Sequence, residues 1–448
     1  MTGWPYLLTL TLLAPLAGIV ATMLTRDLHR ARRVSLGSLA LTLAAASAAG
    51  FDAYIGGYGE RPLVLGAFAI DGVSALMLPV IGMLQLLVAV GTSKVHTTHA
   101  TSVRLLLATL FALSAATAVS GLVLIGSMTA AAAIPLWDLH SRRRSLRAYL
   151  SYMAPALGLL LAGWIGISAS PGINTGLMAA GLLIYCGMVP GHAWAPALFE
   201  SGRLGSALSF ALPMMPVMAV VRLLLPSAPA DVLAVAGWAC LFTGVYAGGL
   251  AVVQDSARRF YGWLVLSQIS MVMFAALQAT PAGLTAALCL WASAALSLVG
   301  LALPLRGLEA RFGALSLREH HGLYTQVPTL AVCFLVAGLG CAGFPGAIGF
   351  VPVELLVSGS FEQGWWVSAI LAVIVMLNGI AVMRAYFSLF TGKRVAASVS
   401  LQATRVERIS IASVVIVVLM GGWLAPNIVA TRHALADQIL IERASALH

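Results

Sequence analysis

Apolar segments recur along the whole chain, and most are about 20 residues long, the length that a helix needs to cross the hydrocarbon core of a bilayer. Of the 448 residues, 60% are hydrophobic and only 9% are charged, so a soluble fold could not cover its surface with polar groups. A transmembrane β-barrel is excluded because its strands alternate in runs of about ten residues. The sequence therefore predicts an all-α integral membrane protein.

Fourteen such segments can be counted, so we expect about 14 transmembrane helices in a single polytopic membrane domain over residues 1–448. The first segment has no basic stretch before it, which indicates a membrane helix and not a cleaved signal peptide. The approximate spans are 4–24, 34–54, 70–93, 104–119, 121–138, 147–168, 175–191, 204–224, 231–253, 260–278, 283–304, 328–350, 365–388 and 409–428.

The basic residues support this count. All but four of the 25 Lys and Arg residues are assigned to alternate loops, and this assignment includes Arg104, Arg147 and Arg384, which lie just inside the ends of their segments. The exceptions are Arg61, Arg222, Arg432 and Arg443. Since positively charged loops stay in the cytoplasm, we expect a multi-pass protein of the bacterial cytoplasmic (inner) membrane with both termini outside. The net charge of +10 thus reflects orientation, and no nucleic-acid partner is expected.

Two segments contain prolines at positions that fall within the membrane. Pro213 and Pro216 lie in the segment 204–224, and Pro345 lies in the glycine-rich run GLGCAGFPGAIGFVPVELL. Each proline removes a backbone donor and clashes with the preceding turn. Unpaired backbone at this depth is tolerated only inside protein or beside a wet cavity. The pattern predicts two broken helices, as in transporters built from inverted repeats, with a simple packing kink as the alternative.

No residue pattern indicates a cofactor or a catalytic centre. The cysteines lie inside apolar segments without C-x-x-C spacing, so we interpret them as core residues and not as metal ligands or disulfides. No motif for NADH, flavin, quinone, an iron–sulfur cluster or zinc is visible, so no catalytic centre is expected in this chain. The five cysteines are Cys186, Cys240, Cys289, Cys333 and Cys341.

Four stretches occur in the same order as in one known family. They are DGVSAL (71–76), PGHAWAPALFE (190–200), QDSARRFYGWLVLSQIS (254–270) and GFPGAIGFVPVELLVSG (343–359). Together they cover a core of about residues 68–390, and they resemble motifs of the antiporter-like, proton-conducting membrane subunits of respiratory complex I, membrane-bound hydrogenases and multisubunit cation/proton antiporters. The resemblance implies two inverted five-helix repeats, each containing a broken helix, and a role in ion translocation.

The resemblance also implies titrating groups that this chain lacks. The family's lysine on the first broken helix falls at residues 214–216, and its glutamate on helix five falls near residues 126–127, where no acid is present. Its central His and Lys cluster falls on Cys289, Ser293 and Ser297. The chain has only two lysines, Lys94 and Lys393, and both lie in loops. The proton path is therefore expected to be degenerate or rewired.

A few residues remain as candidates for an ion path. Glu354 lies within one residue of the family's Lys or Glu, with an interfacial glutamate as the alternative. Arg258 takes the place of a family lysine, although arginine does not deprotonate in proteins and could instead be a surface anchor. Asp71 is expected to cap a helix. The full set of candidates is Glu354, Glu200, His192, Arg258, Ser293 and Ser297.

Three functions fit these observations. The chain could be a membrane subunit of a complex I-like (NADH-quinone oxidoreductase-like) or hydrogenase-like ion-translocating complex, as the G-x-P-G-x-x-G-F run favours. It could instead serve a bacterial inorganic-carbon (bicarbonate/CO2) uptake pump with a soluble zinc partner. The third possibility is a non-conducting scaffold. The missing titrating groups favour it, whereas the broken helices argue against it. The expected partners are other membrane subunits and the lipid bilayer, with a soluble redox or zinc-containing partner left open.

Overall fold

The structure is a computed structural model, and it describes residues 4–55, 66–92, 98–141, 146–392, 407–422, 436–437 and 440. These residues form helices and no named strand. Eleven of the described helices are long and apolar enough to cross a membrane. The prediction of an all-α integral membrane protein is confirmed, whereas the count of fourteen spans and the two inverted repeats stay predictions.

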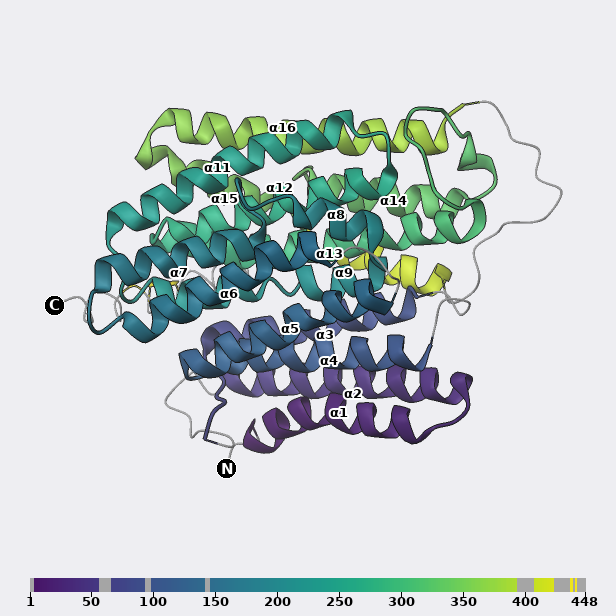
Figure 1. The fold of residues 1–448 in the computed structure, drawn as a ribbon. Coiled ribbons are helices and arrows are strands. Elements are labelled where there is room, and N and C mark those ends of the chain that lie inside the picture. The colour runs from purple at the N-terminus through teal and green to yellow at the C-terminus, as the bar shows by residue number, and fades with distance from the viewer. Residues whose placement is uncertain are drawn as a thin grey trace. The chain divides into compact units, whose positions relative to one another are not determined.

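The chain divides into two compact units, and the first comprises residues 1–146 and 202–223. In this unit α1 packs on α2 and α4, and α9 packs among α3, α4 and α5. Its helices are α1 (Trp4–Leu24), α2 (Leu28–Ile55), α3 (Gly72–Val90), α4 (His99–Thr117), α5 (Gly121–Ser141), α9 (Leu204–Ala211) and α10 (Met215–Ala219), followed by a π-helical turn, Val220–Leu224 (Figure 1).

The second unit comprises residues 147–201 and 224–448. Here α13 packs against α12, α14 and α15, and its most apolar stretch is buried throughout. The helices are α6 (Arg147–Gly166), α7 (Pro171–Cys186), α8 (Trp194–Ser201), α11 (Ala230–Val253), α12 (Ala257–Leu277), α13 (Pro281–Phe312), α14 (Pro328–Cys341), α15 (Phe350–Gly359) and α16 (Trp365–Phe390), with 3-10 turns at Leu323–Thr325 and Ser360–Gln363 and a further helical stretch, 407–422. One polytopic domain over residues 1–448 stays a prediction.

Side-chain caps explain where several of these helices begin. The Asp71 carboxylate accepts a hydrogen bond from the Ser74 backbone N–H, and the Ser74 hydroxyl oxygen accepts one from the Asp71 N–H. This capping box satisfies two backbone donors at the start of α3, as predicted for Asp71. Thr98, Ser256 and Thr280 cap α4, α12 and α13 by accepting a backbone N–H of the first turn through the side-chain hydroxyl.

The start of α4 corrects one interpretation from the sequence. Because Thr98 caps it, α4 begins at His99, five residues before the predicted start of that segment. Arg104 therefore lies inside the helix, with only 2% of its side chain exposed, and its assignment to a loop was wrong. The predicted separation of the fourth and fifth segments is present, since α4 ends at Thr117 and α5 begins at Gly121.

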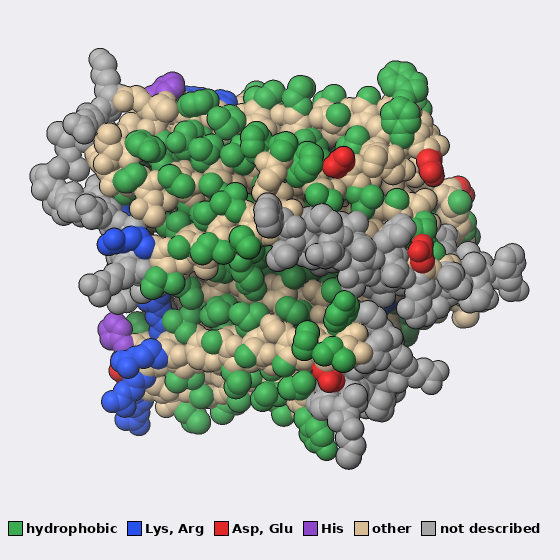
Figure 2. Space-filling view, turned by 180° about the vertical axis from the view of Figure 1, so that it is seen from behind, with side chains coloured by type: hydrophobic (Ala, Val, Ile, Leu, Met, Phe, Trp, Pro, Cys, Tyr) green, Lys and Arg blue, Asp and Glu red, His purple; other side chains and the backbone are tan. Residues whose placement is uncertain are grey.

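Charged side chains lie mainly at the ends of the helices. On the face shown in Figure 2, hydrophobic side chains cover much of the described surface, and Lys, Arg, Asp and Glu side chains are few. Such a surface suits lipid contact. Part of the charge argument lies outside the described residues, as does the end of the last segment, 423–428. The basic residues concerned are Arg61, Lys94, Arg142, Arg143, Arg144, Lys393, Arg394, Arg405, Arg432 and Arg443.

Candidate functional site

The first interruption predicted from the sequence lies between α9 and α10. Pro213 has no N–H to donate to the Ser209 carbonyl, four residues earlier, and Met214 takes a left-handed conformation with φ of +43°. The Ser209 carbonyl instead accepts a hydrogen bond of 3.1 Å from the side-chain amide of Gln85, on α3. Because Gln85 is only 1% exposed, a neighbouring helix supplies the missing donor inside the protein.

The second predicted interruption lies between α14 and α15. As at the first, a glutamine of a neighbouring helix donates a hydrogen bond to the carbonyl that the proline leaves without a donor. Pro345 cannot donate to the Cys341 carbonyl, and the amide of Gln268, on α12, donates to that carbonyl at 2.8 Å. Gly343 and Gly346, both with positive φ, turn the chain between the two half-helices. Gln268 is 2% exposed, so this contact too is shielded from water and lipid.

A third interruption, between α7 and α8, was missed by the sequence analysis. Gly187 is left-handed with φ of +76°, and the peptide bond before Pro190 is cis. The Trp194 indole N–H donates to the Ile184 carbonyl, and the Val189 N–H donates to the hydroxyl of Thr243, on α11. Glycine followed closely by proline was the available signal, but the segment 175–191 was apolar enough to be interpreted as one continuous helix.

His192 follows this interruption and lies among aromatic side chains. Its ring packs edge-on against Tyr246 and lies 5.7 Å from the ring of Trp263, measured between centroids. Neither His192 Nδ1 nor Trp263 Nε1 has a hydrogen-bond partner among the described residues, although both atoms are buried. A water molecule between polar atoms of this kind is the usual way in which they are satisfied. His192 is therefore a packed histidine that keeps one ring nitrogen available.

The remaining charged candidates are mostly paired. Glu200 lies 3.3 Å from Arg259, and both side chains are about half exposed. Arg258 binds Glu309 through two nitrogens, at 2.6 and 2.8 Å, which ties the start of α12 to the end of α13. This fork geometry suits an anchor. Glu354 differs, because it is exposed on α15 and forms no ion pair or hydrogen bond with any residue that the structure describes.

Buried uncharged side chains lie on α13 and α16, the helices that pack against α14 and α15. Ser293 is buried and its hydroxyl donates to the Leu290 carbonyl, whereas the hydroxyl of Ser297 has no partner among the described residues. Asn378, on α16, is fully buried, and neither its amide nitrogen nor its carbonyl oxygen has a partner there. Buried amides without protein partners usually bind water. Sequence reasoning missed Asn378 because no motif marks it.

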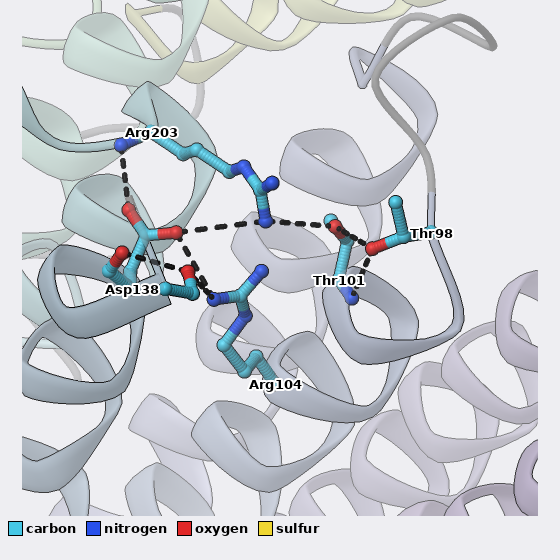
Figure 3. A network of polar contacts seen from close by, with 6 residues as sticks. Thr98, Thr101, Arg104, Asp138 and Arg203 are labelled. Atoms are coloured by element: carbon cyan, nitrogen blue, oxygen red, sulfur yellow. Dashed lines mark hydrogen bonds and ion pairs between the residues drawn. The ribbon is translucent and has the colours of Figure 1, made fainter. Parts of the chain in front are cut away.

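A buried ionic network in the first unit was also missed. Figure 3 shows Asp138, at the end of α5, between Arg104 of α4 and Arg203, which precedes α9. One carboxylate oxygen lies 3.1 Å from Arg104 Nη1 and 3.7 Å from Arg203 Nη1, and the other accepts the Arg203 backbone N–H at 2.7 Å. Asp138 is fully buried. The network joins α4, the end of α5 and the residue that precedes α9.

Arg222, one of the exceptions to the charge pattern, is also neutralised. It forms an ion pair of 2.8 Å with Asp71 and donates to the Ala118 carbonyl. Because its charge is paired, Arg222 does not contradict the alternate-loop pattern of basic residues.

With this geometry in place, the chain can be compared with known proteins. The family model described as "NADH:quinone oxidoreductase/Mrp antiporter, TM" matches residues 155–396, more than half of the chain. The chain belongs to this family. As a member of the NADH:quinone oxidoreductase/Mrp antiporter family, it carries the α7–α8 and α14–α15 interruptions and Asn378 within the matched region.

Curated relatives of this family member align over part of their length. It is 21% identical to NADH-quinone oxidoreductase subunit M of Rickettsia bellii over 262 residues, which are 57% of this chain and 53% of that protein. It is 32% identical to NADH-quinone oxidoreductase subunit N 1 of Streptomyces griseus over 241 residues, 50% of this chain and 49% of that protein. The chain spans about half the length of the curated relatives it matches. These relatives do not favour the inorganic-carbon alternative.

Solved structures share the fold of this family member. A chain of respiratory complex I from Thermus thermophilus superposes with a TM-score of 0.85 at 20% identity, covering 97% of this chain and 99% of that one. A chain of the Mrp complex from Dietzia sp. gives 0.85 at 18% identity, with 98% of both chains covered. An archaeal membrane-bound sulfane sulfur reductase gives 0.82 at 20% identity, covering 92% and 75%. At these identities the likeness establishes the fold.

Proposed function

We propose that this chain is an ion-translocating membrane subunit of a multisubunit complex of the NADH-quinone oxidoreductase or hydrogenase type, with a rewired proton path. The observation that carries the proposal is the α14–α15 interruption, which lies inside the region matched by the family model. A non-conducting scaffold would not need an interrupted helix. Here the backbone carbonyl of Cys341 has lost its helical donor and accepts a hydrogen bond from the buried side-chain amide of Gln268.

We describe the proton path as rewired because no lysine is expected inside the membrane segments, where uncharged side chains take the place of the family's titrating groups. Both lysines of the chain, Lys94 and Lys393, lie outside the described residues, in stretches that the sequence predicts to be loops. The buried side chains near the interruption are Ser293, Ser297 and Asn378, which can hold water but do not exchange protons near neutral pH. Glu354, a few residues beyond the interruption, is then the group that takes up or releases the ion.

The assembly and orientation complete the proposal. The chain works with other membrane subunits, since the relatives and similar structures are parts of multisubunit assemblies. Redox chemistry, where it is coupled, resides in a partner, and a soluble redox partner is the form we expect. The chain lies in the bacterial inner membrane with its basic loops in the cytoplasm and both termini outside, as the positive-inside rule requires.

The test replaces Glu354 with glutamine in the assembled complex. Glu354→Gln keeps the size of the side chain and removes its titration, so ion translocation coupled to the complex's reaction should fall while assembly is unchanged. Inverted membrane vesicles report translocation through a pH-sensitive dye, and native gels report assembly. The matched control is Glu319→Gln, an exposed glutamate in the loop after α13. Normal translocation by Glu354→Gln would assign Glu354 to a passive interfacial role.

A further inference from the structure

One face of α12 carries polar side chains at successive turns of the helix. Arg259, Trp263 and Ser267 are four residues apart, so they line one side of α12 at intervals of about 6 Å along its axis. Arg259 lies in the first turn and is about half exposed, whereas Trp263 and Ser267 are buried. Gln268, which donates to the carbonyl freed at the α14–α15 interruption, follows Ser267 directly. This face of α12 therefore leads from an exposed helix end to the interruption.

The first buried position on this face has two polar atoms without partners. Trp263 Nε1 and His192 Nδ1 are both buried, and neither has a hydrogen-bond partner among the described residues. Tyr246 packs edge-on against both rings, which holds them in place. A buried donor without a partner is costly, and a bound water molecule removes that cost. The arrangement favours water at these two nitrogen atoms, which we call the first water site.

The next turn of α12 has a second set of unpaired polar atoms. Asn378 of α16 is fully buried, and both polar atoms of its amide lack partners in the part of the chain that the structure describes. A Cβ added to Gly248 of α11 would lie 3.5 Å from Asn378 Oδ1, 3.5 Å from Ser267 Oγ and 3.1 Å from Leu377 Cβ. Because glycine lacks this carbon, room comparable to a water molecule is left beside two oxygen atoms. This is the second water site.

Two other glycines of α11 show that such room is specific to Gly248. A Cβ added to Gly244, four residues earlier, would lie 2.6 Å from Ile374 Cδ1 and 2.8 Å from Ser270 Oγ, so this glycine is required for close helix packing. Gly249 has no neighbour within 4 Å of an added Cβ. Of the three, only Gly248 borders polar atoms without partners. Gly248 is therefore the position where one added methyl group displaces water.

The second water site lies next to the α14–α15 interruption. Gly379 follows Asn378 on α16, and a Cβ added to it would lie 3.6 Å from Ala342 Cβ. Ala342 follows Cys341, whose carbonyl accepts the side-chain amide of Gln268 at 2.8 Å. Both α16 and α12 thus contact the interrupted backbone at the level of the second water site. Water bound there is continuous with the interruption.

We propose that the ion path reaches the α14–α15 interruption along this face of α12, through water bound first beside Trp263 and then beside Asn378. His192 and Gly248 complete the two water sites, and the exposed end of the route lies at Arg259. These are positioning residues, because they hold the water that carries the proton. The inference rests on the proposed function and names the route by which protons reach the interruption.

The first test asks whether water reaches Asn378. In the assembled complex, Asn378→Cys is placed in a chain whose native cysteines are replaced by alanine, and silver ions are added. Silver binds thiolates and reaches them only through water, and later alkylation in denaturant counts the thiols left free. Asn378→Cys should be blocked several times faster than Ile374→Cys, which lies one turn earlier on α16 and is equally buried. Equal rates would overturn the proposal.

The second test measures proton translocation per turnover of the complex in inverted membrane vesicles. Asn378→Leu keeps the size of the side chain and removes its polar atoms, so most translocation should be lost while assembly on native gels is unchanged. Gly248→Ala fills the same site from another helix and should act alike. Asn378→Ser keeps a group that binds water and should retain translocation. The matched control, Gly249→Ala, makes the same change in open space and should equal the parent.

Glu354→Gln separates this proposal from the proposed function. If Glu354→Gln loses translocation while Asn378→Leu and Gly248→Ala keep it, the route along α12 is wrong and the proposed function stands. If silver reaches Asn378→Cys and Asn378→Leu loses translocation while Glu354→Gln is normal, the route stands and the role of Glu354 is wrong. Equal losses in Asn378→Ser and Asn378→Leu would assign Asn378 to packing and contradict the route. Because Asn378 and Gly248 lie on different helices, either variant decides if the other fails to assemble.

Discussion

At the scale of single residues, Asp138 is the buried charge whose partners are best defined. Asp138→Asn removes the one carboxylate that pairs with Arg104 among the described residues, and it leaves this guanidinium, which is 2% exposed, without a negative partner there. Removing one member of a buried ion pair typically costs about 3–5 kcal/mol. We expect a loss of this size in the free energy of unfolding, measured by denaturant titration in detergent. Asp27→Asn, which breaks the exposed 3.7 Å pair with Arg30, should cost under about 1 kcal/mol.

A double variant separates the charge effect from local packing. Arg104→Met together with Asp138→Asn removes both buried charges, so it should be more stable than Asp138→Asn alone. If the double variant is no better than the single one, the carboxylate acts through its hydrogen bond to the Arg203 backbone and not through Arg104.

The pair between Asp255 and Arg318 predicts a pH dependence of stability. These exposed residues join the loop before α12 to the loop after α13 at 2.7 Å. The hydrogen bond from Arg318 lowers the pKa of Asp255. A lowered pKa in the folded state contributes stability above the ordinary aspartate pKa of about 3.9, and this contribution is lost as the pH falls through the lowered value. The parent should therefore unfold at a higher temperature than Asp255→Asn near neutral pH.

Thermal unfolding at a series of pH values checks this. The difference between the parent and Asp255→Asn should be constant above about pH 5 and should shrink as the medium is made more acidic. A difference that is the same at every pH would show that the stabilisation by Asp255 does not depend on the ionisation of its carboxyl group.

At the scale of helices, two interruptions share one mechanism that can be tested. Gln268→Leu should cost about 1–3 kcal/mol, because the Cys341 carbonyl, which Pro345 cannot reach, is left without a donor. In a Pro345→Ala background the backbone N–H is restored and can serve that carbonyl. The loss caused by Gln268→Leu should then be smaller, and a double-mutant cycle of unfolding free energies measures the difference.

The same cycle with Gln85 and Pro213 gives an independent test at the α9–α10 interruption. Gln254→Leu is the matched control, because Gln254 donates to the Leu250 carbonyl at the end of its own helix and no proline is involved. Strictly additive effects at both interruptions would contradict the mechanism.

The local features of single helices could be predicted from the sequence, whereas the contacts between distant residues could not. Local chemistry indicated the interruptions at Pro213 and Pro345 and the cap at Asp71, because each effect acts within four residues. The donors Gln85 and Gln268, and the pairing of Arg104 with Asp138, join residues far apart in the sequence, and only the packed helices bring them together. The α7–α8 interruption was missed because glycine and proline inside a strongly apolar run do not by themselves distinguish a break from a kink.

At the scale of the whole molecule, the charge pattern predicts which loops face the cytoplasm. Single cysteines replacing Thr25 and Gly313, in loops next to arginines, should be protected from an impermeant thiol reagent in intact cells. Cysteines replacing Ser120 and Gly364, in loops at the other ends of the helices, should react. The native cysteines within the described residues are all buried, which keeps the background low. Labelling of Thr25→Cys and Gly313→Cys from outside would reverse the orientation.

The last prediction concerns transport by the chain alone. A complete proton relay needs several titrating groups spaced across about 30 Å of hydrocarbon. Among the described residues, Glu354 is unpaired, Glu200 and Asp138 are bound to arginines, and the groups around the α14–α15 interruption are uncharged. Water on Asn378 and Ser297 could carry a proton through part of that distance but could not store it. The purified chain in sealed vesicles with an imposed pH gradient should therefore conduct at the rate of empty vesicles, and coupled flux should appear only with partner subunits. Strong sodium- or potassium-dependent proton exchange by the isolated chain would mean that a path other than the one proposed crosses it.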